Sequence, residues 1–128
     1  MNRRAFFFTV LAVSAGVPPA RAASGVAVIY VGGWDCPYCT TWKNQYKAAW
    51  VASPEYKKVT WTEIDPPKLR EAYQERYWPG DLKAVLDQIP RKSGTPRFLI
   101  VKDGKLVSNE FGAGKWVSSL AALKKLVG

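Results

Sequence analysis

The sequence predicts a small α/β layer structure that contains one parallel strand pair and one hairpin. Three observations lead to this fold class. An apolar run, Val26–Val31, leads into an amphipathic helix and then into a second strand-like run at residues 59–64. An Asp-Gly pair at residues 103–104 separates two more strand-like runs, and an amphipathic segment follows them. Because a helix joins the first two strands, we expect those strands to be parallel.

The first strand and its helix have the strongest signals. Val26–Val31 is a continuous, β-branched run, which is typical of a strand buried on both faces. Gly32-Gly33 ends that strand, and Pro37 suits the first turn of the helix that follows. Apolar residues then recur at spacings of three and four and mark one helical face: Cys39, Trp42, Tyr46 and Trp50.

The middle of the chain predicts a second strand and a helical insertion. Residues 59–64 alternate between two faces, as a strand does. Residues 66–92 make a long connection with two helix-like segments, 68–77 and 81–89, separated by Pro79-Gly80. Two interpretations of this insertion stay open: it recognises a partner near the active site, or it packs on the sheet as extra helix.

The last part of the chain predicts a hairpin and a closing helix. Residues 98–101 and 106–111 are strand-like and flank Asp103-Gly104, a dipeptide that favours hairpin turns. Four residues then mark one face of a helix: Trp116, Leu120, Leu123 and Val127. The expected elements therefore fit one domain, as does the length of 128 residues.

The composition is that of a globular protein and excludes several kinds of active site. Hydrophobic residues make up 48% of the chain, which is too many for a disordered one. The chain has no histidine, so Ser-His-Asp and Cys-His catalysis and histidine-based metal sites are excluded. The net charge of +9 comes from scattered residues, without a basic stripe that carries aromatics. We therefore expect no nucleic-acid partner.

Residues 1–22 have the order of a cleavable export signal. Arg3-Arg4 gives a basic start, residues 5–16 are apolar, and Ala20-Arg21-Ala22 supplies small residues at a cleavage site. The apolar run is shorter than the roughly 20 residues that span a bilayer as a helix. The alternative is an uncleaved membrane anchor.

Export leaves a mature domain of residues 23–128 in the periplasm, without stable membrane insertion after cleavage. Arg3-Arg4-Ala5-Phe6 also resembles the twin-arginine pattern, so that route and general secretion both stay open. Either route ends in an oxidising compartment, where two cysteines can form a disulfide.

Cys36-Pro37-Tyr38-Cys39 is a C-x-x-C motif at the start of the predicted helix. The free N–H groups and the dipole of a helix N-terminus favour an anion, so they favour a thiolate at Cys36. That thiolate is the nucleophile of thiol–disulfide exchange. Cys39 lies one turn further on the same side, where it can resolve a mixed disulfide. The dithiol is thus a redox centre that needs no cofactor.

Two other interpretations of the cysteine pair are weaker. A static disulfide over such a short loop adds only about 2 kcal/mol of stability, against about 3 kcal/mol for fifteen residues. A tetrahedral zinc site needs two more cysteine or histidine ligands, and the chain has none, so only a dimer could build one. We therefore predict no metal site within one chain.

Three segments together resemble thioredoxin-fold oxidoreductases. Gly33-Trp34-Asp35-Cys36-Pro37-Tyr38-Cys39 resembles the thioredoxin active-site segment, with the Pro-Tyr dipeptide of glutaredoxins. Residues 94–105, which begin Gly-Thr-Pro, resemble the family's Thr-Pro loop, strand and hairpin. Phe111-Gly112-Ala113 and the last helix resemble the family's ending. The resemblance implies a thioredoxin-like fold over residues 23–128, with a central four-stranded mixed sheet flanked by helices.

The resemblance also implies a substrate groove. It makes Pro96 a cis proline beside the cysteines and lets the backbone of Thr95 pair with an extended substrate segment. Trp34, Pro37 and Tyr38 then lie where a substrate would contact them. The alternative is that Thr95-Pro96 is an ordinary turn at the entry of a strand, and that Trp34 simply packs.

The sequence departs from the family at the groups that tune the thiols. Thioredoxins bury an aspartate near the end of the first strand and a lysine on the next, where this chain has Tyr30 and Trp61. In thioredoxins, that aspartate and lysine would move protons to and from the thiols. Glu63 could replace them in this role, or it could be exposed on its strand. Asp35 stands directly before Cys36, where thioredoxins have tryptophan. It either tunes thiol ionisation or is a solvated surface carboxylate.

The function that these features predict is exported thiol-disulfide oxidoreduction, more specifically the reduction of protein disulfides. The expected partners are disulfide-containing protein substrates and a membrane electron donor. The alternative is a non-catalytic peptide-binding module on the same fold, with a static Cys36–Cys39 disulfide. The sequence leaves the direction of electron flow open, because family members with opposite functions share the helix-terminal cysteine.

Overall fold

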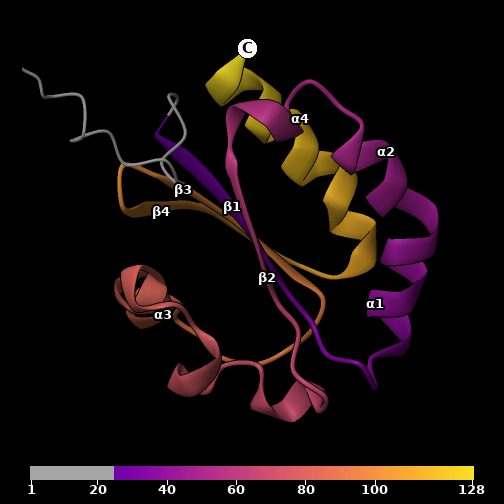
Figure 1. Cartoon of the computed structure of the whole chain (residues 1–128), viewed down its shortest axis with the longest axis vertical. Helices are drawn as coiled ribbons and strands as arrows, with labels where there is room; N and C mark the ends of the chain where they lie inside the picture. Colours follow the sequence, from indigo (N-terminus) through magenta and orange to yellow (C-terminus); the bar gives the residue numbers. More distant parts are fainter. Residues whose placement is uncertain (1–24) are drawn as a thin grey trace, which may run out of the picture.

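A four-stranded mixed sheet forms the centre of the computed structural model, which describes residues 25–128 (Figure 1). Its strands are β1 (Val26–Val31), β2 (Thr60–Ile64), β3 (Arg97–Lys102) and β4 (Lys105–Phe111), in the order β2-β1-β3-β4. β1 pairs with β2 in parallel and with β3 in antiparallel fashion. The predicted sheet is confirmed, while the export signal predicted at residues 1–22 lies outside the described residues.

Helices cover both faces of the sheet (Figure 1). On one face lie α1 (Pro37–Trp42), α2 (Ala48–Val51) and α4 (Trp116–Val127), and on the other lies α3 (Lys83–Asp87). β1 is buried on both sides. Val28 and Tyr30 face the first layer, which holds α1, α2 and α4, while Ile29 and Val31 face the second layer, which holds α3. No helix within residues 25–128 has the length and apolarity that crossing a bilayer requires.

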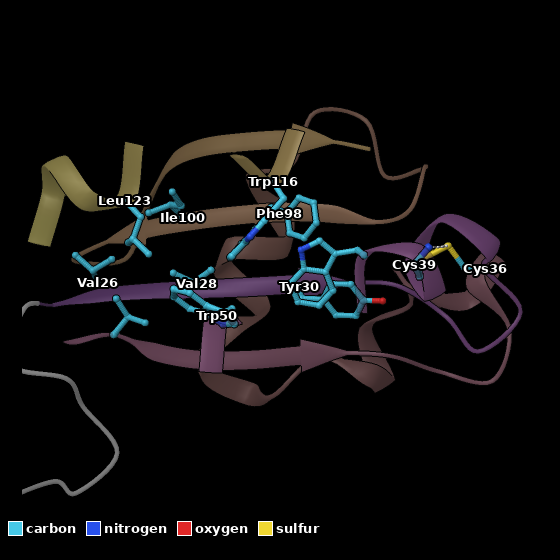
Figure 2. Close-up of a cluster of buried hydrophobic side chains, with 12 residues drawn as sticks. Val26, Val28, Tyr30, Cys36, Cys39, Trp50, Phe98, Ile100, Trp116 and Leu123 are labelled. Atoms are coloured by element: carbon cyan, nitrogen blue, oxygen red, sulfur yellow. Dashed lines mark hydrogen bonds between the residues drawn. A yellow bond between two sulfur atoms is a disulfide. The ribbon is translucent and has the colours of Figure 1, made fainter. Parts of the chain in front are cut away.

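Aromatic side chains fill the first layer (Figure 2). Trp42 is fully buried and stacks on Tyr30 with ring centroids 4.9 Å apart. Trp116 from α4 meets Trp42 edge-on at 5.3 Å and Trp50 at 5.2 Å. The predicted helical face is confirmed in Cys39, Trp42 and Trp50, which are all buried.

A π-helical segment, Lys43–Lys47, separates α1 from α2 within one continuous helix. The regular spacing of apolar residues indicated only an α-helix, so this segment was missed. Its wider turn carries Lys43 and Lys47 at its two ends, and both amines reach carboxylates at the end of β2. The segment thus supplies the polar contacts beside the aromatic layer.

The 66–92 insertion is less helical than predicted. Residues 68–77 form two 3-10 turns, Leu69–Glu71 and Glu75–Tyr77, separated by Gln74 in an extended conformation. The indole N–H of Trp78 donates to the carbonyl of Ala72 at 2.8 Å, and both residues are buried. Burying that indole against the sheet uses a carbonyl that a regular helix would need. The expected helix at 68–77 is therefore wrong.

The predicted hairpin forms at Asp103 and Gly104, which both adopt positive φ angles of 50° and 84°. Such angles belong to tight hairpin turns, and glycine at the second position adopts them without steric cost. The turn pairs Lys102 with Lys105 and sets β4 as the edge strand.

The aromatic layer predicts a large loss of stability for Trp42→Ala. Removing this side chain leaves a cavity between Tyr30 and Trp116, so we expect the free energy of unfolding to fall by about 3–5 kcal/mol. Val117→Ala is the control, because Val117 is 60% exposed and should change stability by less than about 0.5 kcal/mol. Denaturant unfolding followed by circular dichroism measures both. Equal losses would contradict this packing.

Candidate functional site

Cys36 and Cys39 form a disulfide where β1 has ended and α1 begins. Cys36 is the residue that caps α1, and Pro37 occupies the first helical position, as predicted. The backbone N–H of Cys39 donates to Cys36 Sγ at 3.1 Å. In the reduced protein this N–H would point at a thiolate on Cys36, and a hydrogen bond to the charged form stabilises it.

The Thr95–Pro96 loop, which leads into β3, also contacts the disulfide. Thr95 Oγ1 donates to Cys36 Sγ at 3.2 Å, although 59 positions separate the two residues. The peptide bond between Thr95 and Pro96 is cis. Two donors therefore converge on one sulfur, the Thr95 hydroxyl and the Cys39 N–H. Two distant motifs of the sequence meet at this point.

The disulfide is buried between exposed aromatic side chains. Cys36 and Cys39 are only 2% and 1% exposed, whereas Trp34 and Tyr38 are 70% and 68% exposed. Pro37 is exposed as well. Three of the residues predicted to contact substrate, Trp34, Pro37 and Tyr38, thus lie on the surface, whereas the other two, Thr95 and Pro96, are buried.

Comparisons with known proteins show the fold to which this chain is similar. No protein-family model matches the chain, and no curated protein matches its sequence. Among solved structures, the periplasmic thioredoxin SoxS of Paracoccus pantotrophus superposes with a TM-score of 0.57 at 14% identity, covering 80% of this chain and 96% of that one. A thioredoxin of Malassezia sympodialis gives 0.56 at 17% identity, covering 85% and 81%. Spinach chloroplast thioredoxin f gives 0.55 at 20% identity, covering 86% and 85%.

The chain has a thioredoxin fold. The predicted fold class is confirmed, and the disulfide has the C-x-x-C spacing.

Asp35 connects the cysteine loop to the 66–92 insertion. Its Oδ1 accepts from the backbone N–H of Leu69 at 2.7 Å, and the N–H of Trp34 donates to the carbonyl of Pro66 at 3.0 Å. Gly33 permits this approach, because a Cβ atom there would lie 2.5 Å from the Leu69 Cα. The sequence left Asp35 either as a tuning group or as a surface carboxylate. The structure adds a third role, attachment of the insertion to the thioredoxin fold.

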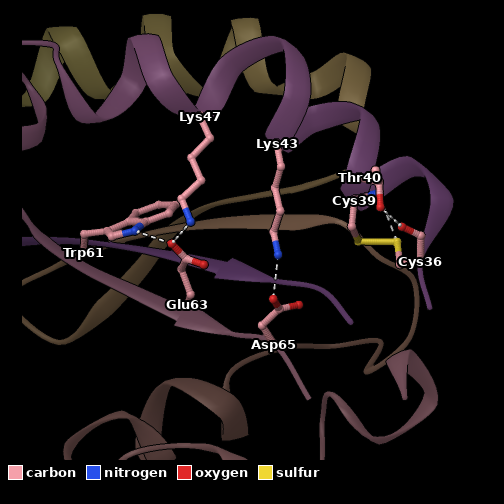
Figure 3. A network of polar contacts seen from close by, with 8 residues as sticks. All are labelled: Cys36, Cys39, Thr40, Lys43, Lys47, Trp61, Glu63 and Asp65. Atoms are coloured by element: carbon pink, nitrogen blue, oxygen red, sulfur yellow. Dashed lines mark hydrogen bonds and ion pairs between the residues drawn. A yellow bond between two sulfur atoms is a disulfide. The ribbon is translucent and has the colours of Figure 1, made fainter. Parts of the chain in front are cut away.

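Glu63 is held away from the cysteines by other groups. It accepts from the indole N–H of Trp61 at 3.1 Å and pairs with Lys47 at 2.8 Å. A second pair, Lys43–Asp65 at 2.6 Å, lies between it and the disulfide (Figure 3). Asp65 is thus the carboxylate on the cysteine side, and sequence reasoning missed it. The only available signal was its position directly after the second predicted strand.

Tyr30 is the residue that the family resemblance matched to a buried aspartate. Its ring is fully buried, and among the described residues its hydroxyl has no hydrogen-bond partner. Burial raises the pKa of Tyr30 well above its usual value, and the carboxylates of Asp65 and Glu63 raise it further. The phenol therefore stays neutral, and it cannot act as an anionic base beneath the disulfide (Figure 2).

The unpaired hydroxyl predicts that Tyr30→Phe stabilises the protein. A buried polar group without a partner costs about 1–3 kcal/mol, so removing it should raise the free energy of unfolding by about 1 kcal/mol. Tyr73→Phe is the matched control, because the Tyr73 hydroxyl makes two hydrogen bonds and its loss should destabilise by about 1 kcal/mol. Denaturant titrations of both variants measure the difference, and a less stable Tyr30→Phe variant would show that the hydroxyl is paired.

No group of three cysteine, aspartate or glutamate side chains within residues 25–128 is arranged to hold a metal ion. The groups that the site presents are the two sulfurs, the donors from Cys39 and Thr95, and the exposed side chains of Trp34 and Tyr38.

Proposed function

We propose that this protein is an exported thiol-disulfide oxidoreductase that reduces disulfides in other proteins. The observation that carries the proposal is the pair of donors on Cys36 Sγ, one from Cys39 and one from Thr95. They converge on the sulfur that would carry the negative charge, where charge-assisted hydrogen bonds are strongest. The likeness of the fold to thioredoxins supports the same activity.

The reaction follows from the two sulfurs. The Cys36 thiolate attacks a substrate disulfide and forms a mixed disulfide, and one substrate sulfur leaves as a thiolate. Cys39 then loses its proton and attacks Cys36, which closes the internal disulfide and releases the second substrate sulfur. The substrate gains two electrons and the Cys36–Cys39 dithiol loses two. No cofactor takes part.

The substrate would dock on the Thr95–Pro96 loop as an extended segment. The backbone of Thr95 would pair with that segment and hold its cysteine against Cys36. Trp34, Pro37 and Tyr38, exposed around the sulfurs, would contact the flanking residues.

Location and electron supply complete the proposal. The signal-like residues 1–22 support export to the periplasm, and one of the structural neighbours is a periplasmic thioredoxin. A reductant in an oxidising compartment must be supplied with electrons. Its donor would be a membrane protein that passes electrons across the membrane and reduces the Cys36–Cys39 disulfide.

A redox titration tests the activity. We expect the tryptophan fluorescence of residues 23–128 to change reversibly as Cys36–Cys39 is reduced, with a potential near about −270 mV if the protein is a reductant. A value near about −120 mV would reverse the proposed direction of electron flow.

The cysteine variants test the assigned roles. Cys36→Ser should reduce the rate of protein-disulfide reduction to background, because the nucleophile is gone. Cys39→Ser should instead accumulate a covalent mixed disulfide with substrate, detectable by mass spectrometry of non-reduced samples. A Cys36→Ser variant that keeps its activity would contradict these roles.

A binding module with a static disulfide is the second candidate. The near-complete burial of both cysteines favours it. The same titration separates the two functions, since a static disulfide gives no reversible transition between about −320 and −120 mV.

A further inference from the structure

Tyr73 attaches the 66–92 insertion to the loop that precedes Pro96. Its hydroxyl donates to the carbonyl of Gly94 at 2.6 Å and accepts from Arg97 Nε at 2.9 Å. Tyr73 is partly buried, and burial raises the pKa of its hydroxyl, so it stays a neutral donor. One side chain of the insertion thus holds both Gly94, before the cis peptide bond, and Arg97, the residue that follows Pro96.

Arg97 completes the attachment from the other side. Its guanidinium donates to the carbonyl of Ser93 at 2.5 Å and to Asn109 Oδ1 at 2.7 Å, and it lies over the ring of Phe111. Arg97 is 7% exposed and, within residues 25–128, forms no ion pair. Burying a cation without an ion pair is costly, and hydrogen bonds offset that cost. The guanidinium of Arg97 makes these bonds to the 93–96 loop, to the insertion and to the edge strand β4.

The same insertion also holds the cysteine loop through two hydrogen bonds. The N–H of Leu69 donates to Asp35 Oδ1, and the N–H of Trp34 donates to the carbonyl of Pro66. Residues 66–73 therefore bond to both loops of the site, the one before Cys36 and the one before Pro96. Few residues separate these two attachments, so the insertion links the cysteine loop to the loop before Pro96.

We propose that residues 66–73 set the position of the substrate-docking loop, with Tyr73 and Arg97 as positioning residues that select for protein disulfides. The inference rests on the proposed function and deepens it. A protein substrate pairs with the backbone of the 93–96 loop, so its binding depends on where that loop is held. A small disulfide does not pair with the backbone of the loop, so the loop affects its reaction only through the Thr95 hydroxyl on Cys36 Sγ.

The test compares two disulfides with Tyr73→Phe and Arg97→Lys. Each pre-reduced variant is mixed with insulin or with 5,5′-dithiobis(2-nitrobenzoic acid), and single-turnover rates are recorded. We expect the half-saturating insulin concentration to rise about three- to tenfold, as the loss of hydrogen bonds implies. The maximal rate, the rate with the small disulfide and the reduction potential depend on the loop only through the Thr95 hydroxyl, so each should change by a smaller factor than the half-saturating insulin concentration. Arg97→Lys keeps the charge, so an effect there reports the lost fork of donors.

Tyr77→Phe and Arg76→Lys are matched controls within the same insertion. Their hydrogen bonds go to Glu71 and Gln74, not to the 93–96 loop. If the two controls raise the half-saturating insulin concentration as much as Tyr73→Phe and Arg97→Lys do, the inference is wrong. Equal losses with both disulfides also overturn it, because the thiol and not docking is then affected. A wild-type protein inactive toward both disulfides overturns the proposed function itself. Circular dichroism verifies that each variant is folded.

Discussion

The antiparallel pairing of β1 with β3 is the constraint on which the site depends. Its register sets Val31 opposite Arg97 at one end of the sheet. Cys36 follows Val31 by a short loop, and Thr95 precedes Arg97 by two residues. Both loops therefore leave the same end of the sheet, and their meeting on Cys36 Sγ follows from strand register. A slip of one residue in the pairing of β3 with β1 would turn the side chains of β3 to the opposite face of the sheet.

The layer beneath the disulfide is supported by aromatic packing, with charge kept at its edge. Tyr30 and Trp42 fill the space under α1, and neither offers an ionisable group to the cysteines at neutral pH. The carboxylates nearest to them, Asp65 and Glu63, are each paired with a lysine from the π-helical segment. Cys36 and Cys39 thus pack in one cluster with neutral aromatic side chains, while hydrogen-bond donors reach Cys36 Sγ from Cys39 and Thr95.

The sequence was sufficient for the elements whose stability is local or whose burial is complete. The strand Val26–Val31 was predicted to the residue, because a run of β-branched residues buried on both faces leaves no other element. The meeting of the cysteine and Thr95–Pro96 motifs came from family resemblance. The 3-10 turns of the insertion could not be predicted, since they depend on where the Trp78 indole finds its acceptor. The bonds of Asp35 and Arg97 were missed for a related reason: each joins segments far apart in the chain.

The burial of the disulfide explains why loop position matters in this molecule. Cys36 is only 2% exposed and Thr95 contacts its sulfur, so a substrate sulfur must be positioned closely to reach it. Displacing a positioning group by about 1 Å can cost about a hundredfold in rate. The loop next to Cys36 has glycine at position 94, with a φ angle of 91°, and glycine by itself does little to restrict a backbone. The bonds from Tyr73 and Arg97 to this loop supply the rigidity that its own sequence lacks.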